Sequence, residues 1–356
     1  MARYLDAFLR ASASEVNREL LKFLPRRITK KWVDSVLGVP EFGFDYAASE
    51  GAVTGPIWDF LDRGGKRWRP ALMLLSCEAV GGKPALVKGF CVVPELIHTG
   101  TLIVDDVEDG SLLRRGKKAL HVTYGVDIAV NAGNLLYFLP LKVLDAFVKR
   151  KGRAFRETAA SIYGFYIDEM MKLSFGQAMD IYWHHGHNNV SEKQYLQMCS
   201  YKTGSLARFS AGLGAALGGA SEKQARALID FAGSVGVAFQ IHDDVLNLRP
   251  GKFWGKEIGD DIKEGKRTLI VIHSLSKLGP KKRKRLLQIL GSQSSSRKDV
   301  AEAIGILEST GSIDYASGVA RRLVSKSWGN LGKQLRESRA KETLKGFADY
   351  LVERKI

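Results

Sequence analysis

The acidic segment 105–109 reads DDVED, and Arg114 and Arg115 follow it closely. Residues four apart share one face of a helix, so Asp105 and Asp109 can direct a carboxylate each into a single cavity. Carboxylate oxygens suit Mg²⁺, which often shares its coordination shell with substrate phosphates. Arginines are planar, permanently charged donors that bind phosphate oxygens. The spacing therefore predicts a magnesium and diphosphate site; the alternative is a solvated acidic helix followed by a basic loop.

A second acidic segment, 243–247, repeats this spacing as DDVLN within the otherwise apolar stretch 231–248. A helix that is apolar around most of its girth is buried. Buried carboxylates are rare unless they are paired or bind a metal. The segment 95–109 likewise leads from apolar residues into aspartates. Two such helices facing each other across a cavity could clamp a magnesium diphosphate from both sides.

Six motifs, in order along the chain, resemble those of the trans-isoprenyl diphosphate synthases. They are segment 64–70 (GGKRWRP), segment 105–115, segment 176–180 (GQAMD), segment 202–204 (KTG), segment 239–244 (FQIHDD), and Lys256 with the run 261–266. The resemblance covers about residues 64–268 and is closest to the geranylgeranyl diphosphate synthases. A single motif would be weak evidence, but six in the family's order are specific.

The resemblance implies head-to-tail condensation of an allylic diphosphate with isopentenyl diphosphate, with Mg²⁺ as cofactor. The metal ligands that it implies are Asp105, Asp109, Asp180 and Asp243. The catalytic residues that it implies are Asp105, Asp109, Lys202, Gln240 and Asp243. The implied allylic diphosphate site consists of Arg114, Lys202, Thr203, Gln240, Lys256 and Lys266. The implied isopentenyl diphosphate site consists of Lys66, Arg69, His98 and Arg115, a cationic pocket without metal.

Some of these assignments have structural alternatives. His98 could be a core histidine, and Gln177 and Asp180 could simply tie two helices together. The second acidic segment ends in Asn247 where many relatives of the family carry a third aspartate, so Asn247 is not assigned as a ligand. Asn134 likewise replaces an aspartate and is expected to affect packing more than chemistry.

Product length should depend on the residues just before the first acidic segment. Gly100 and Thr101 lie about one helical turn below Asp105, where a bulky aromatic residue would close a tunnel for the growing tail. Each isoprene unit spans roughly one turn, ~5.4 Å. The small residues favour geranylgeranyl (C20), with C25 or longer as the alternative. Tyr137 and Phe138 are candidates for the floor of the tunnel, and Gly100→Phe is expected to shorten the product.

Apolar residues recur at spacings of three and four over most of the chain, which predicts an all-α fold, a single large helical bundle around a central cavity. The chain has 356 residues, 45% of them apolar, and no linker divides it. We expect one domain, 1–356, with an N-terminal helical segment at 1–50, a catalytic core at 51–275 and C-terminal helices at 276–356.

The net charge of +16 accompanies basic runs at 26–31 and 281–285. No nucleic-acid motif accompanies them, so nucleic acid is not an expected partner. The runs are solvated helix ends or, alternatively, sites of transient contact with an anionic membrane surface. Three cysteines without metal-binding spacing indicate a reducing compartment, and the cytoplasm is the expected location. The resemblance implies a homodimer.

Two other functions fit part of the pattern. A terpene cyclase would share the fold and the first acidic segment, but position 251 is Gly where cyclases usually carry Glu. A cyclase also needs no second diphosphate pocket. A non-catalytic subunit of a heteromeric synthase would usually lack one acidic segment, and both are present here.

Overall fold

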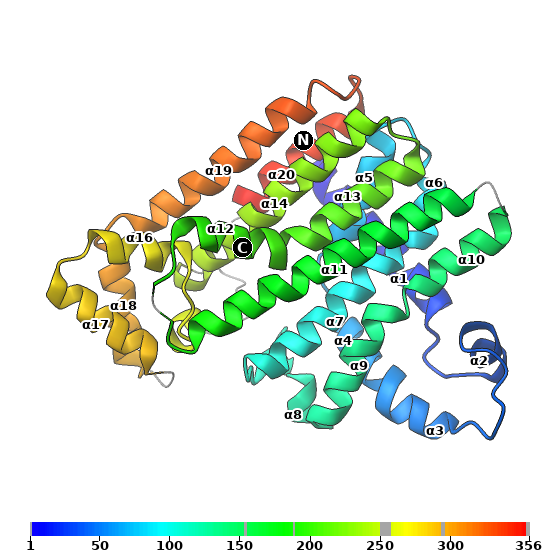
Figure 1. The fold of residues 1–356 in the computed structure, drawn as a ribbon, viewed down its shortest axis with the longest axis horizontal. Coiled ribbons are helices and arrows are strands. Elements are labelled where there is room, and N and C mark those ends of the chain that lie inside the picture. Colours follow the sequence, from blue (N-terminus) through cyan, green and yellow to red (C-terminus); the bar gives the residue numbers. More distant parts are fainter. Residues whose placement is uncertain (1, 153–154, 188, 250–257, 293–295, 354–356) are drawn as a thin grey trace.

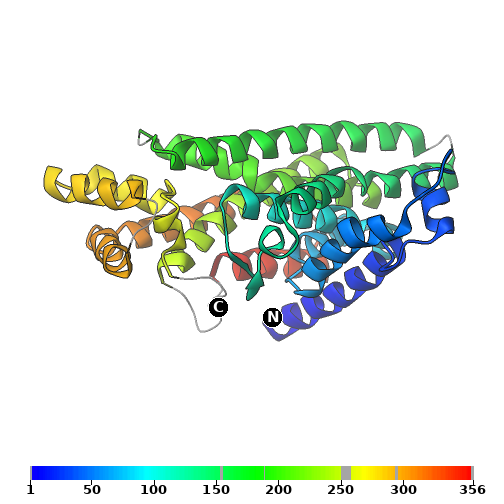
Figure 2. The ribbon, with the colours of Figure 1, turned by 90° about the horizontal axis from the view of Figure 1, so that it is seen from below.

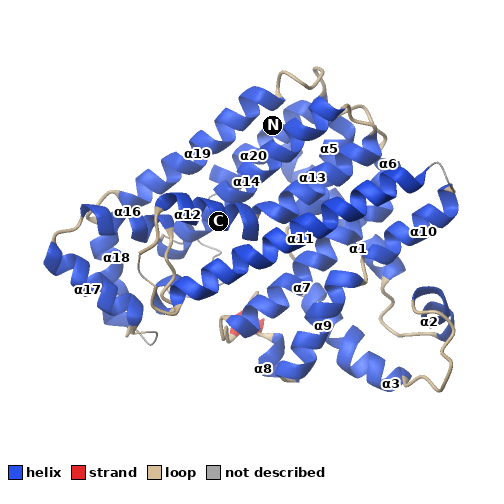
Figure 3. Cartoon of the chain, viewed as in Figure 1, coloured by secondary structure: helices blue, strands red, loops and turns tan. Residues whose placement is uncertain are grey.

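The chain folds into a bundle of α-helices (Figures 1 and 3). The computed structural model describes residues 2–152, 155–187, 189–249, 258–292 and 296–353. The first half contains α1 (Ala2–Phe23), α2 (Lys30–Val36), α3 (Tyr46–Ser49), the π-helical turn η1 (Glu50–Thr54), α4 (Gly55–Asp62), α5 (Trp68–Ala79), α6 (Pro84–Val87), the 3₁₀ turn η2 (Lys88–Cys91), α7 (Val92–Glu108), α8 (Leu120–Tyr124), α9 (Val126–Phe138) and α10 (Leu141–Lys151). The second half contains α11 (Arg156–His184), α12 (Glu192–Lys202), α13 (Gly204–Gly218), α14 (Glu222–Leu248), α15 (Asp260–Lys263), α16 (Leu269–Lys277), α17 (Pro280–Gly291), α18 (Arg297–Glu308), α19 (Ser312–Leu331) and α20 (Arg339–Glu353). The predicted all-α fold is confirmed.

One short hairpin interrupts the helices, and the sequence pattern did not predict it. Strand β1 (Leu113–Arg114) pairs antiparallel with β2 (Lys117–Lys118). The two residues between them, Arg115 and Gly116, have φ values of +54° and +75°. Positive φ at both central residues matches the right-handed twist of a tight hairpin. The turn separates the two arginines, so that Arg114 lies in a strand and Arg115 at the bend.

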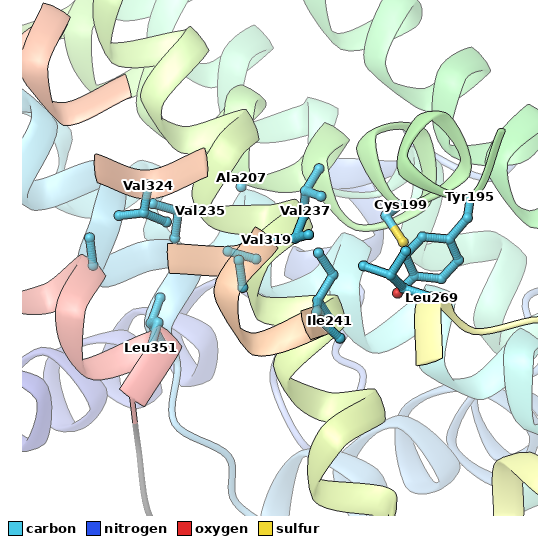
Figure 4. Close-up of a cluster of buried hydrophobic side chains, with 14 of the residues drawn as sticks. Tyr195, Cys199, Ala207, Val235, Val237, Ile241, Leu269, Val319, Val324 and Leu351 are labelled. Atoms are coloured by element: carbon cyan, nitrogen blue, oxygen red, sulfur yellow. The ribbon is translucent and has the colours of Figure 1, made fainter. Parts of the chain in front are cut away.

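Helices α13 and α14 pack together at the centre, with α5 against α13 and α19 against α14. Their contact is apolar, and side chains such as Ala207, Val235 and Val319 interdigitate there (Figure 4). A second apolar cluster fills the space around α7 and α9. The two clusters hold the C-terminal ends of α7 and α14, which carry the acidic segments, in fixed positions.

Close packing at glycines brings the junction of α12 and α13 against its neighbours. A Cβ atom on Gly176 of α11 would lie 2.3 Å from the backbone N of Lys202. A Cβ on Gly236 of α14 would lie 2.7 Å from the Cα of Gly204. Both distances are far below van der Waals contact, so only glycine allows these approaches. The junction carries Lys202 and Thr203, and the glycines therefore set where these two side chains begin.

The stretch 84–108 is the one part of the described chain that is long and apolar enough to cross a bilayer. Its most apolar window is 67% buried inside the protein. Pro94 lies in the first turn of α7, where a proline leaves no helical hydrogen bond unmade. The apolar character of this stretch therefore serves the core of the bundle.

Candidate active site

A cavity of about 540 Å³ opens between α7, α11, α12, α13 and α14. Six carboxylates line it: Asp105, Glu108, Asp180, Asp243, Asp244 and Asp261. Five cationic side chains also line it: Arg69, Arg114, Lys202, Lys266 and Arg267. Both acidic segments therefore reach one cavity, as the sequence predicted, from the C-terminal ends of α7 and α14.

Asp105 contacts three polar side chains at the edge of the cavity. Its Oδ1 accepts hydrogen bonds from Lys202 Nζ at 3.1 Å and from Gln177 Nε2 at 3.0 Å. Its Oδ2 lies 3.6 Å from Arg114 Nη2. Burial alone would raise the pKa of Asp105, but the positive charges of Lys202, Lys266 and Arg114 outweigh burial and hold the pKa well below its ordinary value. Asp105 is thus a carboxylate at any physiological pH.

Asp109 does not line the cavity in this structure. Helix α7 ends at Glu108, and Asp109 is its C-cap residue. Its carboxylate accepts a hydrogen bond from Lys266 Nζ at 3.1 Å. Lys266 also lies 2.5 Å from Glu264 and 3.9 Å from Asp261. Asp109 therefore contacts Lys266, which lines the cavity, but does not line the cavity itself.

Lys202 joins the acidic end of α7 to α11. Its Nζ donates to Asp180 Oδ2 at 2.7 Å as well as to Asp105. Burial would lower the pKa of Lys202, but Asp105 and Asp180 raise it above the ordinary value, so the amine keeps its charge. Gln177 lies one turn before Asp180 on α11 and donates hydrogen bonds to Glu108 at 2.7 Å and to Asp105. Gln177 and Asp180 therefore tie α11 to α7 and to Lys202 at the edge of the cavity.

In the second acidic segment, Asp243 and Asp244 line the cavity. Asp244 is buried and accepts hydrogen bonds from Tyr195 and Gln240. Burial and the charge of Asp261 raise the pKa of Asp244. Asn247 accepts a hydrogen bond at 3.3 Å from the backbone N–H of Asp261 through its side-chain carbonyl. Asn247 therefore holds the turn that precedes Lys266.

The cationic residues proposed for isopentenyl diphosphate fall into two groups. Arg69 and His98 line the cavity. Burial lowers the pKa of Arg69 to about 10, and burial together with neighbouring arginines lowers that of His98 well below its usual value. Lys66 and Arg115 do not line it. Arg115 donates to the Gly64 carbonyl and stacks 5.1 Å from the Phe60 ring, and Lys66 Nζ lies 5.9 Å from the centre of the Tyr350 ring.

Three comparisons with known proteins bear on this arrangement. Residues 50–307 match the family model described as polyprenyl synthetase. The chain is 39% identical over 292 residues, 82% of its length and 87% of the relative's, to the short chain isoprenyl diphosphate synthase of Methanothermobacter thermautotrophicus. It is 35% identical, over 83% of its length and 87% of the relative's, to the geranylgeranyl diphosphate synthase of Methanosarcina mazei. The crystal structure of the geranylgeranyl pyrophosphate synthetase from Pyrococcus horikoshii Ot3 superposes with a TM-score of 0.85 at 32% identity, covering 99% of both chains.

The chain belongs to the polyprenyl synthetase family. The expected enzyme class, a prenyltransferase that elongates isoprenyl chains, is thereby confirmed. Residue roles carried over from the family motifs stay predictions. Among them, Lys256 lies outside the described residues.

Gly100 and Thr101, which the sequence assigned to product length, precede Asp105 on α7 by about one helical turn. Thr101 lines the cavity, and its hydroxyl donates to the His98 carbonyl at 2.8 Å. Gly100 does not line it. A Cβ on Gly100 would lie 2.7 Å from the Gly133 carbonyl oxygen and 2.9 Å from Leu136 Cβ, so Gly100 faces α9. The absence of a side chain there serves the close crossing of α7 and α9.

Of the two floor candidates, only Tyr137 lines the cavity. Phe138 is 68% exposed on the other side of α9. Consecutive helical residues differ by about 100° in direction, which is why the pair cannot share one face.

Several polar residues of the site escaped the sequence reasoning. Tyr195 and Arg267 line the cavity, and no motif marks either of them as a cavity residue. Arg67 lies within the matched segment 64–70 but is buried in an ion pair with Glu95. Its left-handed backbone, with φ +47°, was also not foreseen. Only burial, which a motif does not encode, separates Arg67 from the exposed Lys66 beside it.

The carboxylates fit Mg²⁺ by donor chemistry, because all are hard oxygen ligands. Within the part of the chain that the structure describes, no three His, Cys, Asp or Glu side chains converge on one point as a protein-only metal site. Mg²⁺ usually takes one or two carboxylates together with substrate phosphates and water. The residues present therefore suit a metal that arrives with a diphosphate.

Proposed function

We propose that this prenyltransferase condenses an allylic diphosphate with isopentenyl diphosphate in a Mg²⁺-dependent reaction and that its main product is geranylgeranyl diphosphate. The observation that carries the proposal is one cavity in which carboxylates from α7 and α14 face buried cations, with an apolar region below. The confirmed family membership supports the reaction class.

The chemistry begins with the C–O bond of the allylic diphosphate, whose electron pair leaves with the diphosphate. Arg114, Lys202 and Lys266 supply fixed positive charge where that negative charge develops. The allylic cation then needs negative dipoles close by, and Thr203 and Gln240, which carry side-chain oxygens, line the same cavity. The double bond of isopentenyl diphosphate attacks the cation, and a new C–C bond forms. The resulting cation loses a proton to the departed diphosphate, which restores a double bond and needs no side-chain base.

Asp105 and Asp243 would hold Mg²⁺, which would supply charge neutralisation for the leaving diphosphate. Asp109 is paired with Lys266 and would join the metal shell only if that ion pair opened. Asp180 pairs with Lys202 and would join the metal shell only if that ion pair opened. Isopentenyl diphosphate would bind beside Arg69 and His98, where Arg69 supplies positive charge and no metal promotes its ionisation.

The C20 length rests on Thr101 and Tyr137. Thr101 is small and leaves the cavity open below the acidic end, whereas the Tyr137 ring limits it farther down. The experiment is to incubate the pure protein with Mg²⁺, isopentenyl diphosphate and each allylic primer, and to size the products by mass spectrometry. A dominant C20 product supports the proposal. A C25 or longer product overturns the length alone, whereas a cyclic hydrocarbon or no product overturns the reaction.

We also propose a homodimer that forms through α11. One side of this helix has no neighbour among the residues that the structure describes (Figure 2). Its large apolar side chains Ile167, Met171 and Phe175 are 54%, 56% and 62% exposed. An apolar face of this kind usually marks a protein interface. Met171→Asp combined with Phe175→Asp should convert a dimer to a monomer in light scattering; a wild-type monomer would rule out the dimer.

A cytoplasmic location is proposed as well, because all three cysteines are free and buried. Contact with an anionic membrane would involve α17, on which Lys281, Lys282 and Lys284 are exposed. Cosedimentation with phosphatidylglycerol vesicles, compared with phosphatidylcholine vesicles, tests this contact. If equal amounts of protein sediment with both kinds of vesicle, the proposed contact with an anionic membrane is wrong.

A further inference from the structure

Four side chains form a continuous chain of hydrogen bonds along one wall of the cavity. The Tyr195 hydroxyl on α12 donates to Asp244 Oδ2 at 2.6 Å. Gln240 Nε2, one turn earlier on α14, donates to Asp244 Oδ1 at 3.0 Å. Thr203, at the junction of α12 and α13, donates its hydroxyl to Gln240 Oε1 at 2.8 Å. This series of hydrogen bonds thus links α12 to α14 and ends at Thr203, the residue after Lys202.

The direction of these bonds fixes which end of the Gln240 amide faces Thr203 and which faces Asp244. The Tyr195 phenol donates to Asp244 Oδ2, so Oδ1 is the acceptor that faces Gln240. An acceptor at Oδ1 requires the amide NH₂ of Gln240, so Oε1 must point toward Thr203. A carbonyl oxygen has two lone pairs, and Thr203 uses one of them.

We infer that Tyr195 is a positioning residue for prenyl transfer, which acts through Asp244 to keep the Gln240 carbonyl dipole directed at the site of the developing allylic cation. The inference deepens the proposed function and depends on it. Without the phenol, Asp244 loses the donor that fixes its carboxylate, which can then turn and withdraw Oδ1 from the Gln240 amide. The amide would rotate, and its NH₂ group, the positive end of the dipole, would face the cation. Preorganised dipoles aimed at developing charge are a major source of catalysis.

The surroundings of Tyr195 hold the phenol in place. Its ring is 1% exposed and lies next to Cys199 and Leu269 (Figure 4). One turn before it, Ser191 and Gln194 form a capping box that fixes the start of α12. A buried side chain on an anchored helix loses little further entropy when it holds a hydrogen bond.

The test compares Tyr195→Phe and Gln240→Leu, singly and together, in the full chain with Mg²⁺ and both diphosphates. For Tyr195→Phe we expect kcat to fall about tenfold, the scale of one hydrogen bond, with both KM values within twofold of wild type. If Tyr195 acts through Gln240, the double variant should be no slower than Gln240→Leu alone. Tyr163→Phe is the matched control, because the Tyr163 hydroxyl makes the same kind of bond, to Asp145 Oδ1 at 2.5 Å, outside the cavity. Its kcat should stay within twofold of wild type.

A Tyr195→Phe enzyme with wild-type kcat, or losses that multiply in the double variant, would overturn the inference. If Tyr195→Phe does not fold, Asp244→Asn provides a second test. The new carboxamide can donate to Gln240 Oε1 and invert the amide, so Asp244→Asn together with Gln240→Leu should match Gln240→Leu alone. Multiplying losses would instead assign Asp244 a role separate from Gln240 and overturn the inference. A wild-type protein that transfers no prenyl group would contradict the proposed function itself, which is a distinguishable result.

Discussion

The cavity has two regions that differ in how their side chains are held. At the charged end, Asp180 is buried, Asp105 and Lys202 are partly buried, and hydrogen bonds connect all three, so each position depends on the others. At the apolar end, Thr101 and Tyr137 line open space and are held by their own helices. A change at the charged end should therefore alter the rate, whereas a change at the apolar end should alter the product and leave the rate largely intact.

Replacing Asp105 by Asn should give the largest effect. The variant would lose a negative charge that faces Lys202 and Arg114, and with it a ligand for the metal. We expect kcat/KM to fall by about 10³-fold, as for the loss of one preorganised electrostatic group. Steady-state kinetics over a range of Mg²⁺ concentrations measures the loss. A variant that recovers wild-type kcat/KM at high Mg²⁺ would show that Asp105 contributes only metal affinity.

Replacing Lys202 by Gln should reduce kcat by about 10²-fold, because one of several charges near the leaving diphosphate is lost. The same change leaves Asp105 and Asp180 without their shared amine. Asp180 is buried, and its pKa, now lowered by Lys202, should rise. Thermal unfolding and the pH profile of kcat measure the two effects. Lys172→Gln is the control, since Lys172 pairs with Glu169 outside the cavity.

Thr101→Phe should shorten the product by at least one isoprene unit with a change in rate below about tenfold, because a ring at Thr101 enters the cavity without touching the charged end. Thr101→Ser is the matched control and should keep the wild-type length. Product sizing with a farnesyl primer distinguishes the two variants. A C20 product from Thr101→Phe would show that the tail follows a different path.

Gly100→Phe, which the sequence alone suggested as a test of product length, is expected to act differently. Its side chain would meet the Gly133 carbonyl and Leu136 on α9 rather than the cavity. Even Gly100→Ala should destabilise the fold, by roughly 1–3 kcal/mol for overpacking. Denaturant unfolding gives the value, and an unchanged free energy of unfolding would mean that α7 and α9 can separate at no cost.

The two regions also differ in how well the sequence predicted them. Asp105 and Asp243 were predicted to share a cavity because polar residues inside apolar helices must be satisfied there. Lys202 was assigned to the same site by its family motif alone. The neighbouring residues Gly100 and Thr101 were assigned the same role, but they face α9 and the cavity respectively. A difference of one position on a helix is a rotation of about 100°, and only the packing of α9 decides which residue meets the cavity.

The polar network shows the same limit. Tyr195 has no motif of its own, because its function depends on where α12 lies beside α14. The hairpin that separates Arg114 from Arg115 was missed for a related reason. Its strands have two residues each, too short for a periodic pattern, and only Gly116 within the turn could have indicated it.

The smallest expected effect concerns His98, which lies on the charged side of the cavity wall. Burial and the arginines around it, Arg69 first among them, lower the pKa of His98 well below 6.5 in the folded chain. As pH falls below about 6.5, the unfolded chain takes up a proton that the folded chain does not, so the free energy of unfolding falls by up to about 1.4 kcal/mol per pH unit from this residue. The stabilisation is complete above that pH and is lost toward the folded-state pKa. In His98→Gln the decline between pH 6.5 and 5 should therefore be shallower than in the wild type. Urea unfolding at half-unit pH steps measures both slopes. Equal slopes for His98→Gln and wild type would mean that folding does not lower the pKa of His98.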